Sequence, residues 1–175
     1  PLLLEIDRAE GIWLYGPDGQ KYLDLVNNVA HVGHEHPAVV RAGQRQMAVL
    51  NTNTRYLHHS ILDYAERLLS WFPPELNRIY FVNSGSEANE LALRMADTIT
   101  GGNARIAIEG GYHGNTNRCI DVSSYKFDGP GGRGRPEDTY LLDMPDSYRG
   151  KVRGALNETG EAYAGQVKDL ISQIG

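Results

Sequence analysis

Hydrophobic residues recur at strand or helix spacing through most of this chain, and glycine or proline separates the segments. Residues 78–82 form a short apolar run that is typical of a buried strand. Residues 86–99 follow with one apolar helical face, made by Ala88, Leu91, Ala92, Met95 and Ile99. Further strands are expected at 104–109 and 139–142, and a last apolar-faced helix follows them. Strands that alternate with helices predict an α/β fold with a parallel sheet.

The N-terminal part of the chain has a different pattern. Apolar-rich segments at 10–15 and 21–25 flank the sequence Gly-Pro-Asp-Gly at 16–19. Proline and Asp-Gly are strong turn formers, so these segments predict a β-hairpin. Helices are expected after the hairpin at 37–50 and 61–72, and a proline pair ends the second of them.

The junction between the strand at 78–82 and the next helix has the features of an anion site. Ser84 and Glu87 have the spacing of a capping box. The free N–H groups and the dipole of a helix start favour a phosphate by roughly 0.3–1 kcal/mol even when the site is exposed. Gly85 allows close approach of the backbone, and Ser86 offers a hydroxyl group. Capping boxes are common, so this pattern alone favours an ordinary helix start.

Composition narrows the class of protein. The 175 residues are 41% hydrophobic and 22% charged with a net charge of −5, which is typical of a soluble globular protein. We expect no nucleic-acid partner and no membrane partner, because the chain has no basic excess and its apolar runs fall far below the roughly 20 residues that cross a bilayer. The single cysteine, Cys119, excludes an intrachain disulfide and fits a reducing compartment, so a cytoplasmic location is expected.

Two other motifs suggest chemistry that the surrounding sequence does not support. Residues 129–134 formally satisfy the dinucleotide fingerprint G-x-G-x-x-G, but no strand leads into them and no apolar-faced helix opens from them. A flexible surface loop is expected there instead. His31, His34 and His36 are close in sequence, but no second ligand pair at zinc-like spacing accompanies them. We therefore expect no metal site.

Several motifs together resemble the class III aminotransferases, enzymes that use pyridoxal 5'-phosphate (PLP). These motifs are Ser-Gly-Ser-Glu-Ala at 84–88, Gly-Gly-Tyr-His-Gly-Asn at 110–115, and the segment 22–37. The resemblance covers nearly the whole chain and implies the PLP-dependent transferase fold of type I. It implies an N-terminal segment at 1–37, which carries the small-domain hairpin and a substrate-side loop. Residues 38–175 would then be the first, incomplete part of the parallel-sheet large domain.

The resemblance also assigns site residues. It implies cofactor contacts for Ser84, Gly85, Ser86, Tyr112 and His113, and substrate contacts for Asn28, Tyr56 and Asn115. The Tyr112 ring would stack on the pyridine ring of PLP; the alternative is a core tyrosine with a satisfied hydroxyl group. His113 is open to three interpretations: a group that supports the site, a proton carrier or a turn residue. Many carboxylate-binding relatives have an arginine where this chain has Asn115, which favours a substrate without a carboxylate at that point.

The segments 27–34, 51–58, 125–127 and 145–151 resemble more narrowly the phospho-lyase branch of the family. The function expected from this likeness is β-elimination of phosphate from phosphoethanolamine or a similar phosphorylated primary amine, in a homodimer. One alternative is an ordinary transaminase that moves an amino group to a 2-oxo acid. A non-catalytic phosphate-binding or scaffold module is the alternative from another class.

The lysines of this chain give no candidate for the residue that binds PLP covalently. Lys21, Lys126, Lys151 and Lys168 lie in contexts unlike that of the family's Schiff-base lysine. That lysine is expected beyond Gly175, so no catalytic residue is assigned here. We expect the chain to be an N-terminal fragment that is inactive by itself.

Overall fold

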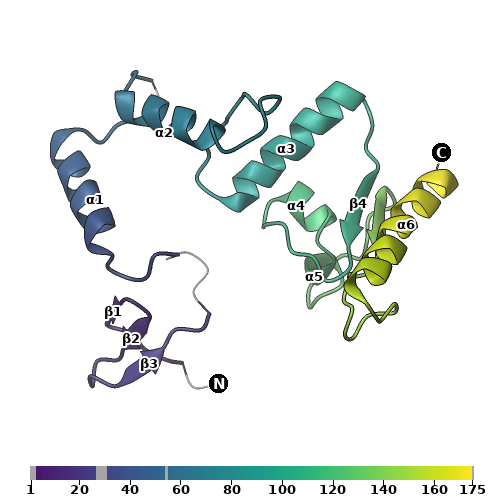
Figure 1. The fold of residues 1–175 in the computed structure, drawn as a ribbon, viewed down its shortest axis with the longest axis horizontal. Coiled ribbons are helices and arrows are strands. Elements are labelled where there is room, and N and C mark those ends of the chain that lie inside the picture. The colour runs from purple at the N-terminus through teal and green to yellow at the C-terminus, as the bar shows by residue number, and fades with distance from the viewer. Residues whose placement is uncertain (1–2, 27–30, 54, 175) are drawn as a thin grey trace. The chain divides into compact units, whose positions relative to one another are not determined.

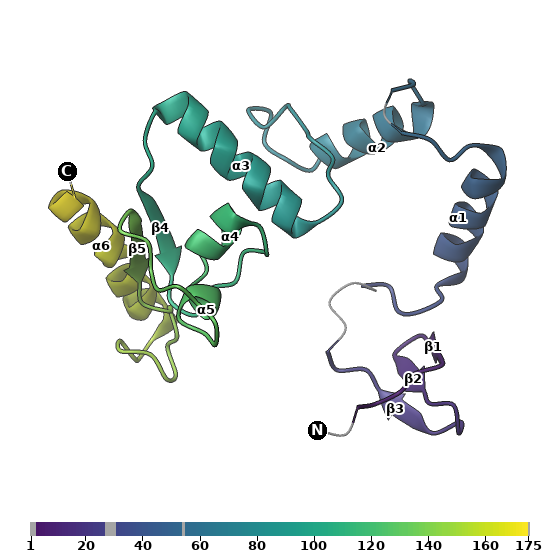
Figure 2. The ribbon, with the colours of Figure 1, turned by 180° about the vertical axis from the view of Figure 1, so that it is seen from behind.

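The structure is a computed structural model that describes residues 3–26, 31–53 and 55–174 (Figures 1 and 2). Its internal contacts divide the chain into two units, Pro1–Pro74 and Glu75–Gly175, and each unit is described by itself. The predicted domain boundary at residue 37 refers to the complete fold and stays a prediction.

Unit 1 begins with a small antiparallel sheet. Its strands are β1 (Arg8–Glu10), β2 (Trp13–Tyr15) and β3 (Lys21–Leu23), in the order β1-β2-β3. β2 and β3 form the predicted hairpin, and the Gly16 N–H donates to the Gln20 carbonyl at 2.9 Å to close the turn. The sequence pattern gave no sign of β1, which adds a third strand to the hairpin.

Two helices complete unit 1. Helix α1 (Pro37–Val49) has its proline in the first turn, where the missing N–H costs no hydrogen bond. Helix α2 (His59–Leu69) is capped by the His58 ring, which accepts from the Ser60 N–H at 3.2 Å. Both predicted helices are confirmed, although α2 ends before residue 72.

Unit 2 is built on two parallel strands, β4 (Arg105–Ile108) and β5 (Thr139–Leu142), with Arg105 opposite Thr139. They lie between the long helices α3 (Gly85–Thr100) and α6 (Leu156–Ile174) (Figures 1 and 2). The short helices α4 (Asn117–Asp121) and α5 (Ser124–Phe127) connect the two strands. The predicted alternation of helices with parallel strands is therefore confirmed.

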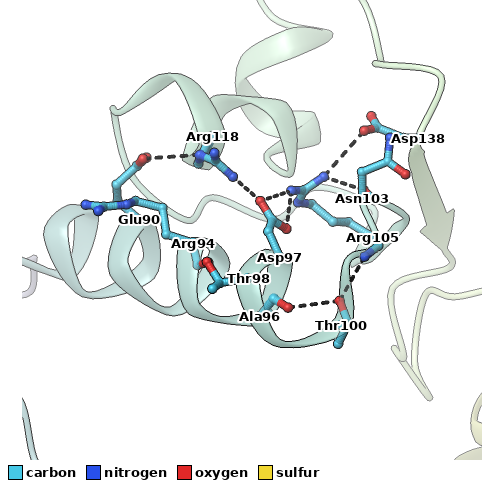
Figure 3. Close-up of polar contacts among 11 residues, drawn as sticks. Glu90, Arg94, Ala96, Asp97, Thr98, Thr100, Asn103, Arg105, Arg118 and Asp138 are labelled. Atoms are coloured by element: carbon cyan, nitrogen blue, oxygen red, sulfur yellow. Dashed lines mark hydrogen bonds and ion pairs between the residues drawn. The ribbon is translucent and has the colours of Figure 1, made fainter.

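A network of charged side chains ties α3 to β4 and α4 (Figure 3). The Arg105 guanidinium on β4 donates to both oxygens of Asp97 on α3, at 2.7 and 2.9 Å. Arg118 on α4 also pairs with Asp97, and its Nε lies 3.4 Å from the Glu90 carboxylate. One carboxylate of α3 thus holds cations from two other elements.

One predicted strand is absent from the structure. Residues 78–82 form no β-strand, and Tyr80 and Val82 are exposed. A strand needs a neighbour for its backbone hydrogen bonds, and the two strands described in unit 2 pair only with each other. The prediction of a buried strand at 78–82 is therefore wrong for the described residues of unit 2, which supply no third strand to pair with this segment.

No helix in the described part of the chain has the length and apolar character needed to cross a membrane.

Candidate functional site

The start of α3 is a capped helix N-terminus with free donors. Ser84 is extended, and its Oγ accepts from the Glu87 N–H at 3.1 Å. The Glu87 carboxylate accepts from the Asn83 backbone N–H at 2.7 Å, one residue earlier than in the usual capping box. No acceptor for the N–H groups of Gly85 and Ser86 is found among the residues that the structure describes. Two donors therefore remain available at the positive end of the helix dipole.

The loop that follows β4 packs directly against this helix start. The Ser86 Oγ accepts from the Asn115 N–H at 3.1 Å, and the Asn89 side chain donates to the His113 carbonyl at 2.8 Å. Gly114 has a φ of 132°, and a Cβ there would lie 2.7 Å from the Ser86 Oγ. The structure thus brings together three predicted site residues, Ser86, His113 and Asn115, from segments far apart in the sequence.

Tyr112 lies just beyond the carboxyl end of β4, at the edge of a parallel sheet where ligands usually bind. Tyr112 is 51% exposed in this structure. The ring meets Tyr125 edge to face with 6.1 Å between centroids, and the Lys126 Nζ lies 5.4 Å from the Tyr112 centroid. Tyr112 therefore offers a half-exposed ring on the loop whose residues His113 and Asn115 contact α3.

Two buried serines hold the loop in place. The Ser124 Oγ accepts from the Gly110 N–H at 2.6 Å, and the Ser123 Oγ accepts from the His113 N–H at 2.9 Å. Ser123 and Ser124 are almost completely buried. Neither serine stands out in the sequence, because serines in a short connection carry no periodic signal. His113 is held through its backbone N–H and carbonyl, and its role stays a prediction.

The carboxyl end of β5 carries an ion pair. The Asp143 carboxylate accepts from the Lys151 ammonium at 2.6 Å and from the Gln166 amide of α6 at 3.2 Å. The hydrogen bond from Lys151 holds the pKa of Asp143 below its ordinary value, and the same contact raises the pKa of Lys151. Nearby, the backbone N–H groups of Arg149 and Tyr148 lower the pKa of Asp146. The basic side chains of this loop are thus engaged in its own structure.

The remaining predicted substrate residues are not part of this arrangement. Asn28 lies outside the described residues. Tyr56 is an exposed residue of unit 1 and lines a groove of about 260 Å³ with Asn53 and His58. Also in unit 1, the His34 Nε2 lies 2.7 Å from the Asp24 carboxylate. No cluster of three metal-binding side chains occurs in the described ranges.

Comparison with known proteins gives the family. Residues 1–174 match the model of the aminotransferase class-III family. The chain belongs to the class III aminotransferases. A class III relative from Drosophila melanogaster, named alanine–glyoxylate aminotransferase 2-like, is 42% identical over 170 residues, which cover 95% of this chain and 34% of that protein.

Solved class III structures have the same fold. A phospholyase from Arthrobacter, in complex with phosphoethanolamine, has a TM-score of 0.83 and 37% identity, and the match covers 98% of this chain and 41% of that one. An amine transaminase from an uncultivated Pseudomonas species, in its PLP-bound form, has a TM-score of 0.83 at 28% identity and covers 99% and 42%. The predicted α/β fold of type I is confirmed. This chain spans between a third and a half of the length of these class III proteins.

Proposed function

We propose that the protein to which this chain belongs is a PLP-dependent class III enzyme that eliminates phosphate from a phosphorylated primary amine such as phosphoethanolamine. The observation that supports this proposal is the junction between the start of α3 and the loop that carries Tyr112 and Asn115. The junction has free donors for a cofactor phosphate and an asparagine in place of the carboxylate-gripping arginine. The likeness to a phospholyase that binds phosphoethanolamine supports the same substrate class.

The residues at this junction fit the cofactor. The N–H groups of Gly85 and Ser86 point out of a helix start, and a Cβ built on Gly85 meets no atom within 4 Å. The space beside the donors is therefore open. The Ser86 Oγ accepts from Asn115, which leaves its own proton free to donate to a phosphate oxygen. We assign the cofactor phosphate to Ser84, Gly85 and Ser86.

Tyr112 and its neighbours would orient the reactants. When bound, PLP supplies an electron sink for the carbon next to the substrate amine. The half-exposed Tyr112 ring would stack on the cofactor and fix its plane, and His113 would hold the loop against Asn89. Asn115, Asn28 and Tyr56 would line the substrate side. A neutral Asn115 neither attracts a carboxylate nor competes for the phosphate leaving group, so it favours elimination.

Two further parts of the proposal concern the whole protein. The lysine that binds PLP covalently would lie beyond Gly175, and the enzyme would be a homodimer. A cytoplasmic location is proposed from the single cysteine. An ordinary transaminase is the second candidate, supported by the likeness to a PLP-bound amine transaminase and to an alanine–glyoxylate aminotransferase 2-like protein.

In the deciding experiment, the whole protein is incubated with PLP and phosphoethanolamine, and the release of inorganic phosphate and aldehyde is measured. We expect both products to be released together. Amino transfer to pyruvate or 2-oxoglutarate without phosphate release would support the transaminase instead. If the protein catalyses neither reaction, the result would support a non-catalytic phosphate-binding module.

Asn115→Arg tests the role of the asparagine. We expect at least a tenfold loss of kcat/KM for phosphate release, because an added guanidinium would bind the leaving group in the wrong place or favour carboxylate-bearing amines. Gln173→Arg, which adds the same charge near the end of α6, is the matched control. Equal losses in both variants would show that charge alone, not the position of Asn115, is responsible.

A further inference from the structure

The glycine-rich loop at 129–134 is part of a cavity that the proposed function does not use. The cavity has a volume of about 470 Å³, and its walls come from α4, α5 and this loop. Asn117 contributes from α4, Lys126 from α5 and Arg133 from the loop. A volume of this order suits a small molecule.

The loop wall is held in a defined shape. The Gly132 N–H donates to the Gly129 carbonyl at 2.9 Å, and the Gly134 N–H donates to the Phe127 carbonyl at 3.0 Å. A Cβ on Gly132 would collide with the Phe127 carbonyl, and Gly131 has a φ of 79°. Glycine is therefore required for the loop to lie this close to the end of α5. Residues 129–134 form a loop, as expected, and backbone hydrogen bonds anchor it; its expected flexibility stays a prediction.

The charge of the cavity is positive. Neither Lys126 nor Arg133 has a carboxylate partner in the part of the chain that the structure describes. The Lys126 Nζ lies near the rings of Tyr112 and Tyr125, 5.4 and 5.8 Å from their centroids. Asp121 also lines the cavity and offsets part of this charge. The two cations exceed the single carboxylate, so the lining attracts anions.

We propose that this cavity binds the phosphate group of a small phosphorylated molecule, at a site separate from the cofactor phosphate at the start of α3. The phosphate oxygens would accept from the Lys126 ammonium, the Arg133 guanidinium and the Asn117 amide. The loop lacks the preceding strand and following helix of a dinucleotide-binding motif. The charged side chains that line the cavity would therefore hold the ligand. This inference does not depend on the elimination reaction.

Lys126 links the cavity to the Tyr112 ring. Its ammonium lies 5.4 Å from the centroid of the Tyr112 ring, and a bound phosphate would compete with the ring for the same charge. Anion binding should therefore shift the ring signals of Tyr112 and Tyr125. A site that did not involve Lys126 would leave these signals unchanged.

The test is an NMR titration of the full chain, without PLP, using inorganic phosphate, phosphoethanolamine and ethanolamine. We expect both phosphate compounds to move the amide signals of Gly131, Gly132 and Gly134, and ethanolamine to leave them in place. Signals of Gly85 and Ser86 report the cofactor site separately. Movement only at Gly85 and Ser86 would overturn the proposal without affecting the proposed enzyme.

For each of four variants, the proposal predicts the direction in which the affinity for phosphate changes. Lys126→Gln and Arg133→Gln should each weaken phosphate binding about fivefold or more, measured at the loop amides. Asp121→Asn should tighten it about twofold, because a repulsive charge is removed. Arg135→Gln removes the cation that directly follows this loop and lies outside the cavity lining, and it should change affinity less than twofold. An equal loss for Arg135→Gln and Arg133→Gln, or weaker binding in Asp121→Asn, would overturn the site.

Discussion

Gly114 shows how one residue without a side chain positions the candidate site. The loop approaches α3 so closely that a Cβ at Gly114 would lie 2.7 Å from the Oγ and 2.8 Å from the Cα of Ser86. The backbone of Gly114 is also in the region that only glycine adopts easily, with a φ of 132°. Both properties serve one contact, the hydrogen bond from the Asn115 N–H to Ser86.

Gly114→Ala is expected to destabilise unit 2 by about 2–4 kcal/mol, the sum of backbone strain and steric overlap. Gly154→Ala is a matched control, because Gly154 has a φ of 138° but open space around it. The control should cost only the strain, about 1–2 kcal/mol. Urea unfolding followed by the NMR signals of α3 measures both. Equal losses would mean that the contact with Ser86 contributes nothing.

The pH dependence of stability follows from Asp143 and Lys151. The pKa of Asp143 is lowered from 3.8, so its contribution is fully present above that pH and is lost as the pH falls through the lowered value. The pKa of Lys151 is raised from 10.5, so its contribution is present below that pH and is lost as the pH rises through the raised value. Asp146 adds an acid step of the same sign.

The midpoint of urea unfolding can be measured as a function of pH from the NMR signals of α6. We expect the midpoint to be constant at intermediate pH and to fall at both acid and alkaline pH. In Asp143→Asn the alkaline fall should disappear and the acid fall should shrink to the part that Asp146 contributes. An unchanged alkaline fall in that variant would show that the Lys151 contact does not affect stability.

Among the elements, α3 is joined to β4 and α4 by ion pairs of its carboxylates. Asp97 holds Arg105 of β4 and Arg118 of α4, and the Arg105 side chain is only 16% exposed (Figure 3). Removal of the Asp97 carboxylate would leave the Arg105 and Arg118 guanidinium groups close together without their common partner. The orientation of α3 against β4, and therefore the position of its N-terminus, depends on this contact.

Asp97→Ala is expected to destabilise unit 2 by about 1–3 kcal/mol. Asp138→Ala is the comparison, because the Asp138 carboxylate makes a single 3.4 Å contact with Arg105 and its side chain is 37% exposed. That variant should lose less than about 1 kcal/mol. Urea unfolding followed by α3 signals distinguishes them, and a larger loss in Asp138→Ala would contradict the assignment of Asp97 as the main partner.

The elements predicted best from sequence are those stabilised within themselves. The helix expected at 86–99 is α3 with one more residue at each end, because its cap and apolar face are local features. The strand expected at 78–82 failed, because a strand is stabilised only by a neighbour. For the site, family motifs singled out Ser86 and Asn115 as separate cofactor and substrate residues, but not the hydrogen bond between them. The supports Ser123 and Ser124 depend on tertiary contacts that no spacing reveals.

At the scale of the whole molecule, the proposed site is shared among parts that this chain only partly contains. The chain covers 34% of its Drosophila relative and 41% of the Arthrobacter phospholyase. The cofactor contacts proposed at α3 and Tyr112 lie within unit 2, whereas Tyr56 belongs to unit 1. A complete enzyme therefore needs groups beyond those of unit 2.

Borohydride reduction in the presence of PLP tests where the covalent lysine lies. We expect the 175-residue chain to give no stoichiometric pyridoxyl adduct on Lys21, Lys126, Lys151 or Lys168, and the whole protein to give one adduct on another lysine. Peptide mass spectrometry after reduction identifies the modified residue. A stoichiometric adduct on one of these four lysines in the whole protein would contradict the proposed arrangement.

Cys119 provides a way to observe opening of the site in real time. It is the single cysteine of the chain, it is completely buried, and its Sγ lies 3.4 Å from the Ser86 carbonyl. A thiol-modifying reagent reaches it only when α4 separates from the start of α3. The rate of Cys119 labelling therefore reports how often that separation occurs, and a phosphate compound that binds at Gly85 and Ser86 should lower this rate.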